Sequence, residues 1–305
     1  MTDAVLLMAY GTPATLDDVP AYFSHIRGGR PVRVEAIEEL QERYRRIGGT
    51  SPLRDVTQAQ AAGLAGLLRA RGRDVPVAVG MKHAPPFISD VVAELGRTGI
   101  RRIAALALAP HYSKESIASY FSAAADASAE HGISLRTRES WHDHPLLVAA
   151  IASRVQAALA AASDPAVVET VFTAHSLPRR ILSWGDPYPD QLLQTSALVA
   201  SSAALGQWRF AFQSASRTGE PWLGPDLLDV LRELAEDGRR EILLCPVGFV
   251  ADHLEVLFDI DVEAQELAHS LGLRLWRTAS LNNGADFLAA LATLATDLLD
   301  EEAAS

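Results

Sequence analysis

The sequence predicts an α/β fold made of two similar, doubly wound domains, each with a parallel four-stranded sheet flanked by helices. Short apolar runs rich in β-branched residues alternate with longer helical patterns along the whole chain. The 305 residues exceed the usual size of one domain, about 100–200 residues. The order of strands and helices also repeats between the two halves. This alternation of strands and helices is typical of parallel sheets covered by helices on both faces.

The predicted strands and helices alternate along the chain. Eight segments are predicted as strands because they are short, apolar and rich in β-branched residues, at 4–9, 75–81, 102–109, 134–137, 167–173, 208–212, 242–246 and 273–276. Nine are predicted as helices from their periodicity, at 33–47, 53–71, 87–97, 115–131, 145–162, 188–204, 225–236, 251–270 and 284–300. Four strands fall on each side of the helix near 145–162. We therefore expect domains at 1–145 and 146–305 with a cleft between them, and a last helix that packs back across the domains.

Composition limits the possible classes of protein. Hydrophobic residues make up 49% of the chain and charged residues 21%, which is typical of a folded globular protein. The single cysteine, Cys245, excludes a disulfide within the chain and a site built from cysteines alone. No apolar run approaches the roughly 18 residues of a membrane span, and the N-terminus lacks the basic region of a signal peptide. We therefore expect a cytoplasmic protein without membrane insertion.

The net charge of −11 argues against general binding to nucleic acids or anionic membranes. An anionic ligand would need clustered arginines, and one such cluster precedes the turn at 48–53. Its members are Arg27, Arg30, Arg33, Arg43, Arg45 and Arg46. In the turn, Ser51 is predicted to cap a helix that begins at Pro52; this pattern fits a plain capped helix or an anion site. Arg43 and Tyr44 together could clamp a flat, carboxylated ligand.

The segment between Glu241 and Leu273 contains no lysine or arginine but many carboxylates. On an α-helix, at about 100° per residue, five acids would form one stripe along an otherwise apolar surface. Like charges four residues apart cost about 0.2–0.5 kcal/mol per pair, so such a stripe needs water or a cation in front of it. Two interpretations stay open, a solvated face and a path or site for a metal cation. The five acids are Asp252, Glu255, Asp259, Glu263 and Glu266.

Several polar side chains directly follow predicted strands, where ligands bind in folds of this class. His175 follows one strand in the second half, and Tyr10 follows the first strand of the chain. A histidine there is either a hydrogen-bonded structural residue or, beside the acidic segment, a metal ligand and proton acceptor. Tyr10, like Tyr120 on a predicted helix, could equally be a core aromatic residue. His83 and His111 receive no role, and neither a dinucleotide-binding glycine motif nor a P-loop is present.

Five motifs together resemble the ferrochelatases over nearly the whole chain. They are Met8-Ala9-Tyr10-Gly11-Thr12-Pro13, His25-Ile26-Arg27, Arg43-Tyr44 with Ile47-Gly48-Gly49-Thr50-Ser51-Pro52-Leu53, Thr173-Ala174-His175-Ser176-Leu177-Pro178, and Gly248-Phe249-Val250-Ala251-Asp252-His253-Leu254-Glu255. The tyrosine in the first motif is similar to that of the bacterial coproporphyrin III ferrochelatases. Protoporphyrin ferrochelatases commonly carry Asn-Leu-Gly-Thr-Pro there.

The resemblance implies a chelatase-like fold and a set of functional residues. His175 and Glu255 would be the catalytic pair and the metal site, and Asp259 and Glu263 would belong to a metal path. The residues that would hold the porphyrin are Tyr10, Arg27, Arg43, Tyr44, Ser51 and Tyr120. Tyr10 would meet the metal from the opposite face of the macrocycle. Gly28 departs from the pattern, because some relatives have a second arginine there.

The implied activity is insertion of Fe²⁺ into coproporphyrin III to give coprohaem in haem biosynthesis. Fe²⁺ and coproporphyrin III would be the substrates of a monomeric enzyme that requires no cofactor. The cysteines that ligate an iron–sulfur cluster in some relatives are absent, which implies that this chain has no [2Fe–2S] centre. Three alternatives stay open: a protoporphyrin IX ferrochelatase that forms protohaem, a cobalt or nickel chelatase acting on sirohydrochlorin-like rings, and a non-catalytic haem or porphyrin carrier.

Overall fold

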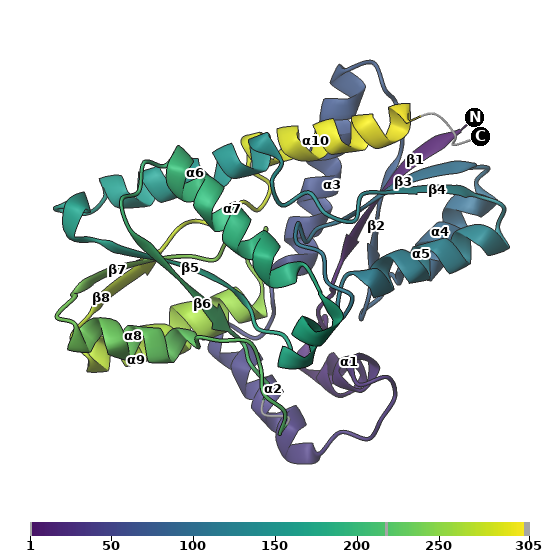
Figure 1. Cartoon of the computed structure of the whole chain (residues 1–305). Helices are drawn as coiled ribbons and strands as arrows, with labels where there is room; N and C mark the ends of the chain where they lie inside the picture. The colour runs from purple at the N-terminus through teal and green to yellow at the C-terminus, as the bar shows by residue number, and fades with distance from the viewer. Residues whose placement is uncertain (1, 217–218, 302–305) are drawn as a thin grey trace. The chain divides into compact units, whose positions relative to one another are not determined.

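The computed structural model describes residues 2–216 and 219–301 and divides the chain into two compact units (Figure 1). Unit 1 consists of Met1–Trp141 and Asn282–Ser305, and unit 2 consists of His142–Leu281. Each unit contains one four-stranded sheet, and every strand pair in both sheets is parallel. The predicted class of fold, two parallel four-stranded sheets flanked by helices, is confirmed.

The sheet of unit 1 has the strand order β2-β1-β3-β4. Its strands are β1 (Asp3–Ala9), β2 (Val77–Met81), β3 (Arg102–Ala107) and β4 (Ser134–Thr137). Strand β1 is central, and Leu7 lies between Val79 of β2 and Leu106 of β3. Since both faces of a central parallel strand are covered, its sequence from Ala4 to Ala9 is a continuous apolar run rather than an alternating one.

Two pairs of helices cover opposite faces of this sheet (Figure 1). The helices α3 (Leu53–Ala70) and α10 (Ala285–Asp300) contact each other, as do α4 (Ile88–Arg97) and α5 (Ala118–Glu130). Alternate side chains of β1, at Ala4, Leu6 and Met8, join the core formed with α4 and α5. The N-terminal part of the unit also forms η1 (Leu16–Asp18), α1 (Val19–Ile26) and α2 (Val34–Arg46).

The last helix belongs to unit 1, whereas the sequence analysis counted it in a domain at 146–305 and expected it to pack back across the domains. Its apolar side chains are buried against α3 and β3, and Phe287 stacks on Trp141 with 6.1 Å between ring centroids. The amide of Gln60 on α3 also donates to the carbonyl of Asn282 at 2.8 Å. The chain therefore returns to unit 1 at Asn282, because the apolar face of α10 is buried there.

The sheet of unit 2 repeats the same topology, with the order β6-β5-β7-β8. Its strands are β5 (Glu169–His175), β6 (Trp208–Gln213), β7 (Glu241–Cys245) and β8 (Arg274–Arg277). One face carries α6 (Pro145–Ala160) and α7 (Tyr188–Ser202), and the other carries α8 (Leu227–Glu236) and α9 (Gln265–Ser270) (Figure 1). Two short 3₁₀ helices, η2 (Pro165–Val167) and η3 (Arg179–Trp184), precede β5 and α7.

The predicted helix at 251–270 differs from the structure in its start and in its hydrogen bonding. Helical residues begin at Leu254, and the segment η4 (Val256–Ala264) is a π-helix that continues into α9. In a π-helix the backbone hydrogen bonds join residues five apart instead of four. The angle of about 100° per residue expected for an α-helix therefore does not apply to this segment. The prediction that five acids share one regular α-helix is therefore wrong, because Asp252 precedes the helix and Asp259 and Glu263 lie in its π-helical segment.

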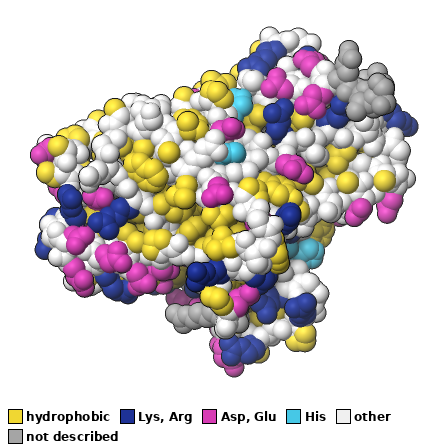
Figure 2. All heavy atoms as spheres, viewed as in Figure 1, with side chains coloured by type: hydrophobic (Ala, Val, Ile, Leu, Met, Phe, Trp, Pro, Cys, Tyr) yellow, Lys and Arg dark blue, Asp and Glu magenta, His cyan; other side chains and the backbone are white. Residues whose placement is uncertain are grey.

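The surface of unit 2 carries exposed apolar side chains over α7 and η3, among them Leu193, Leu198, Leu182 and Trp184. Figure 2 shows hydrophobic side chains gathered over the α7 region, with acidic and basic groups around them. Among the described residues, no helix combines the length and the apolar character that crossing a membrane requires.

Candidate functional site

His175 is the last residue of the central strand β5 in unit 2. Its register partner on β6 is Gln213, and the hydroxyl of Tyr188 donates to its carbonyl oxygen at 2.9 Å. Gly248, in the loop after β7, lies so close to β5 that a Cβ there would be 2.5 Å from the Cβ of Ala174. This close approach of backbones brings the loop and the helix that follows it to the carboxyl end of β5.

The imidazole of His175 is oriented by a backbone carbonyl. Its Nδ1 atom contacts the carbonyl oxygen of Ser176, and since a carbonyl only accepts, Nδ1 carries the proton. The other nitrogen, Nε2, lies 3.4 Å from Oε1 of Glu255. A histidine fixed in this way presents Nε2 as the atom that can take up a proton or bind a metal.

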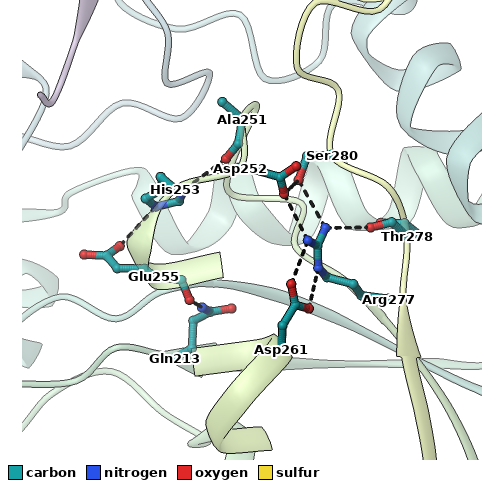
Figure 3. Close-up of polar contacts among 9 residues, drawn as sticks. All are labelled: Gln213, Ala251, Asp252, His253, Glu255, Asp261, Arg277, Thr278 and Ser280. Atoms are coloured by element: carbon teal, nitrogen blue, oxygen red, sulfur yellow. Dashed lines mark hydrogen bonds and ion pairs between the residues drawn. The ribbon is translucent and has the colours of Figure 1, made fainter. Parts of the chain in front are cut away.

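The carboxylate of Glu255 lies between two imidazoles. Besides His175 on one oxygen, Nε2 of His253 lies 3.5 Å from the other oxygen, Oε2 (Figure 3). His253 is oriented like His175, because its Nδ1–H donates to the carbonyl of Ala251 at 2.9 Å. The backbone carbonyl of Glu255 accepts a 3.2 Å hydrogen bond from the amide of Gln213, which connects this residue to strand β6 (Figure 3).

The contact between His175 and Glu255 changes the protonation of both groups. Burial lowers the pKa of His175, but the charge and hydrogen bond of Glu255, the Ser176 carbonyl and the charge of Asp259 raise it more, to about 9. Burial raises the pKa of Glu255, but His175 and His253 lower it more, to well below its usual range. At neutral pH the metal-free pair is therefore an imidazolium and a carboxylate. The two side chains remain 29% and 32% exposed, so substrates can reach them.

Two acids of the segment are paired with an arginine from outside it. Arg277, at the end of β8, lies 3.1 Å from Asp252 and 2.7 Å from Asp261 (Figure 3). Asp252 is therefore not simply a solvated acid, because it is held by Arg277 and by the hydroxyl of Ser280 at 2.7 Å. Arg277, which supplies the positive charge, lies four residues after Leu273, where the segment without lysine or arginine ends.

The remaining acids differ in their surroundings. Asp259 is only 5% exposed and accepts a hydrogen bond from the hydroxyl of Ser214, whose φ of 64° lies in the left-handed region. Glu263 is partly exposed, and Glu266 is exposed. Asp259 is four residues after Glu255 and contributes to the raised pKa of His175, so its charge acts on the same site.

In unit 1, Tyr10 directly follows strand β1 and is 40% exposed. Its ring packs on that of His83, with 4.6 Å between the ring centroids. The Nδ1 atoms of His83 and His25 are 3.0 Å apart, and His25 stacks on Phe87. Burial, together with the charges of Lys82 and His25, lowers the pKa of His83 to about 3, so its ring is neutral beside Tyr10.

Three other predicted porphyrin-binding residues of unit 1 are buried. Tyr44 is 2% exposed, and its hydroxyl lies 3.1 Å from that of Thr12, in the loop after β1. Tyr120 is 5% exposed and belongs to the core between the sheet and the helices α4 and α5. Ser51 is 8% exposed, and its hydroxyl accepts from the N–H of Leu53 at 3.3 Å. Helix α3 begins at Leu53, the first residue of the predicted range 53–71, with Pro52 instead of Ser51 as its N-cap.

Five of the six arginines of the predicted cluster fall into two groups. Arg43 and Arg45 form ion pairs with glutamates on the same helix, at 3.4 Å and 3.1 Å. Arg27, Arg30 and Arg33 are exposed, and none of the three forms an ion pair with another residue that the structure describes. Three guanidinium groups are thus available to an anionic ligand in a chain whose net charge is −11.

The structure brings His175 and Glu255 together within unit 2, and it connects Tyr44 to the loop that follows Tyr10 within unit 1. Two further residues touch these groups and were not predicted, His253 beside Glu255 and His83 beside Tyr10. Each has a signal in the sequence, because His253 is two residues from Glu255 and His83 follows the strand next to β1. No cluster of three or more His, Cys, Asp or Glu suited to a resident metal ion occurs in 2–216 or 219–301.

The fold and the site define the class of this protein as a two-unit α/β protein with the fold of the metal chelatases. Solved structures with this fold include SirB from Bacillus subtilis with Fe³⁺, with a TM-score of 0.63, 13% identity, and coverage of 98% of this chain and 96% of that one. CbiX, the terminal enzyme of sirohaem biosynthesis in denitrifying bacteria, has a TM-score of 0.56, 16% identity, and coverage of 96% and 98%. These likenesses show the fold.

The chain belongs to the ferrochelatase family, whose family model matches residues 2–299. A ferrochelatase of Herpetosiphon aurantiacus is 46% identical over 298 residues, covering 96% of this chain and 98% of the relative. A coproporphyrin III ferrochelatase of Halalkalibacterium halodurans is 39% identical over 302 residues, covering 98% and 97%. The resemblance found in the five sequence motifs is thereby confirmed.

The titration of His175 tests the geometry of the pair without any substrate. In the metal-free protein we expect its ring to titrate near pH 9, above the ordinary value of 6.5. The variant Glu255→Gln should lower this pKa, because the imidazolium loses its carboxylate partner while the effect of burial remains. Histidine NMR spectra recorded across the pH range measure both values. Glu263→Gln is the control and should leave the value unchanged; an equal pKa in Glu255→Gln and the wild type would contradict the pairing.

Proposed function

We propose that this member of the ferrochelatase family inserts Fe²⁺ into coproporphyrin III, with His175 and Glu255 as the groups that accept protons and handle the metal. The observation that carries the proposal is the contact of 3.4 Å between Nε2 of His175 and Oε1 of Glu255 at the carboxyl end of β5. This edge of a parallel α/β sheet is where ligands bind. A porphyrin carrier would have no use for a proton-accepting pair of this kind.

The chemistry requires two protons to leave the ring as the metal enters. The porphyrin loses both pyrrole N–H protons and gains Fe²⁺, so the charge of the macrocycle core is unchanged. We assign both protons to this pair. The resting imidazolium of His175 first gives its Nε2 proton to solvent, and the neutral imidazole then takes the first pyrrole proton and passes it to solvent, while Glu255 shares the transfer of the second. Because the pair is partly exposed, both protons can pass from it to solvent.

The donor set also suits Fe²⁺ as a passing substrate. Imidazole nitrogen and carboxylate oxygen both bind this metal, and two such ligands leave most of its coordination positions for water or the porphyrin. The proton and the metal compete for the same nitrogen of His175, so binding of Fe²⁺ favours loss of the proton. A weak, two-ligand site can release the ion to the ring after the protons have left.

The choice of coproporphyrin III rests on charge. Coproporphyrin III has four propionates and protoporphyrin IX has two, so a cationic surface favours the former. Arg27, Arg30 and Arg33 of unit 1 are exposed and form no ion pair with the described residues. The tyrosine at position 10 supports the same choice, and so does the relative from Halalkalibacterium halodurans, which bears the name coproporphyrin III ferrochelatase. The Herpetosiphon aurantiacus relative bears only the general name, so protoporphyrin IX stays the alternative substrate.

We assign Asp259 and Glu263 to the path by which the cation reaches Glu255. Both lie on the same π-helical segment, four and eight residues after Glu255. Asp259 is almost completely buried yet carries a carboxylate, and a buried acid needs a hydrogen bond or a cation to offset its loss of hydration. Ser214 supplies one hydrogen bond, and the charge of Asp259 acts on the imidazole of His175, so this acid belongs to the same electrostatic site as Glu255.

A comparison of substrates tests the assigned porphyrin. With Fe²⁺ supplied anaerobically, we expect a higher kcat/KM for coproporphyrin III than for protoporphyrin IX, because more propionates meet the free arginines. The variant Arg27→Gln should raise the KM for coproporphyrin III severalfold. Arg71→Gln is the control, since this exposed arginine of unit 1 lies outside the cluster. Faster insertion into protoporphyrin IX would overturn the choice of substrate.

The variant His175→Ala tests the proton acceptor. We expect kcat for iron insertion to fall by roughly 10²- to 10⁴-fold, the usual contribution of a general base, while the affinity for metal-free porphyrin stays the same. Absorbance of the product gives kcat, and porphyrin fluorescence gives the affinity. His269→Ala, at an exposed position on α9, should behave as the wild type. Near wild-type insertion by His175→Ala would show that another group takes the protons.

The variants Asp259→Asn and Glu263→Gln test the metal path. Each removes a charge from the route, so we expect the KM for Fe²⁺ to rise severalfold while the KM for the porphyrin is unchanged. Glu266→Gln on the exposed part of the same helix is the matched control. Initial rates at varied Fe²⁺ concentration give the values. If neither variant differs from Glu266→Gln in its iron dependence, these acids have no part in delivering the metal.

A further inference from the structure

Arg277 holds two carboxylates that flank Glu255 in the sequence. Its guanidinium forms a bidentate pair with Asp261, with Nε 2.7 Å from Oδ1 and Nη2 2.9 Å from Oδ2 (Figure 3). The same Nη2 lies 3.1 Å from Oδ1 of Asp252. Nη1 donates to the carbonyl of Thr278 at 3.2 Å and to the hydroxyl of Ser280 at 3.4 Å. One side chain from the end of β8 thus makes polar contacts with the loop before the helix and with the helix itself.

The two carboxylates could not share one guanidinium on a regular helix. Residues nine apart on an α-helix lie on opposite faces and are about 13.5 Å apart along the axis. Here Asp252 precedes the first helical residue, Leu254, and Asp261 lies within the π-helical segment. The loop therefore folds back toward the helix, and Arg277 joins the two.

We propose that Arg277 is a positioning residue for metal insertion, which fixes the start of the helix and its π-helical segment so that Glu255 meets His175. The proposal rests on the proposed function for the role of Glu255. Glu255 is three residues after Asp252 and six before Asp261, so it lies between the two points that Arg277 holds. Movement of either point would shift its carboxylate relative to Nε2 of His175, which is attached to a different element, strand β5.

The physical strength of the contact supports this role. A bidentate pair between arginine and a carboxylate is both stronger and more directional than a single hydrogen bond. The side chain of Arg277 is 17% exposed, that of Asp252 23% and that of Asp261 37%, so solvent screens the pair with Asp252 less than the pair with Asp261. Ser280 also donates to Oδ1 of Asp252 at 2.7 Å, which restricts the carboxylate from a second direction.

A second arginine on the same strand offers a matched control. Arg274 pairs with Glu241 at 3.3 Å, but its side chain is 55% exposed and its partner belongs to β7 rather than to the acidic helix. Arg274→Gln therefore removes an arginine and an ion pair from β8 without touching the helix of Glu255. Any general effect of losing a charge from this strand should appear in both variants.

The first test is hydrogen exchange of the metal-free protein, which needs no activity. In Arg277→Gln we expect backbone amides of 254–264 to exchange at least about tenfold faster than in the wild type, while those of β5 and β6 keep their rates. Arg274→Gln should match the wild type throughout. Equal exchange in the two variants would overturn the proposal, and so would an even increase across unit 2, because the pair would then stabilise the whole unit and not position one segment.

The second test is the kinetics of iron insertion. In Arg277→Gln we expect kcat to fall by roughly 10- to 100-fold, the usual loss when a reacting group moves by about 1 Å, with an unchanged KM for coproporphyrin III. Arg277→Lys keeps the charge but not the bidentate geometry and should give an intermediate kcat. Asp252→Asn retains the pair with Asp261 and should show a smaller loss than Asp261→Asn. The double variant Arg277→Gln/Asp261→Asn should be no slower than Arg277→Gln alone.

The outcomes separate this proposal from the proposed function. If the wild type forms no iron porphyrin, the proposed function fails, while the exchange rates of 254–264 still show whether Arg277 fixes the helix. If the wild type is active and Arg277→Gln has the kcat of Arg274→Gln, the positioning role is wrong and the proposed function stands. Losses in Arg277→Gln and Asp261→Asn that multiply in the double variant would also overturn the proposal, since they would show independent effects.

Discussion

The contact between the imidazole of His175 and the carboxylate of Glu255 is the interaction on which the candidate site depends. It joins two elements that are 80 positions apart in the sequence, the end of strand β5 and the start of a helix. Each partner controls the other's charge, since the carboxylate favours the protonated imidazole and the imidazolium favours the ionised acid. Much of unit 2 near this edge of the sheet acts to keep the two groups at that separation.

Three contacts within unit 2 restrain the position of Glu255. The absence of a side chain at Gly248 lets the loop after β7 approach Ala174 closely, and Gln213 on β6 bonds to the carbonyl of Glu255. Arg277 then holds the loop and the helix from the other side. Three strands other than β5 thus each contribute one restraint on Glu255, which lies on none of them. These strands are β6 and β7, the two neighbours of β5, and the edge strand β8.

The sequence predicted the strands and the pair more accurately than their surroundings, for physical reasons. Buried parallel strands are apolar runs, and a histidine that ends such a run lies at the ligand-binding edge, so His175 could be found locally. The π-helix could not be predicted from the sequence, because the test for helical periodicity assumes the residue spacing of an α-helix. Arg277 was missed because its partners come from another element, and the placement of α10 in unit 1 depends on packing across most of the chain. The burial of Tyr44 is likewise set by packing and not by its neighbours in sequence.

The acidic segment combines two functions that its composition alone does not separate. Asp252 and Asp261 share the single positive charge of Arg277, while the charges of Glu255 and Asp259 act on the imidazole of His175. If all the acids were paired with arginines, the segment would attract no cation. If none were, their mutual repulsion would oppose the helix and leave Glu255 poorly placed. Under the proposed function, the contacts of Arg277 thus leave Glu255 to the imidazole of His175, whose Nε2 atom would serve first the proton and then the metal.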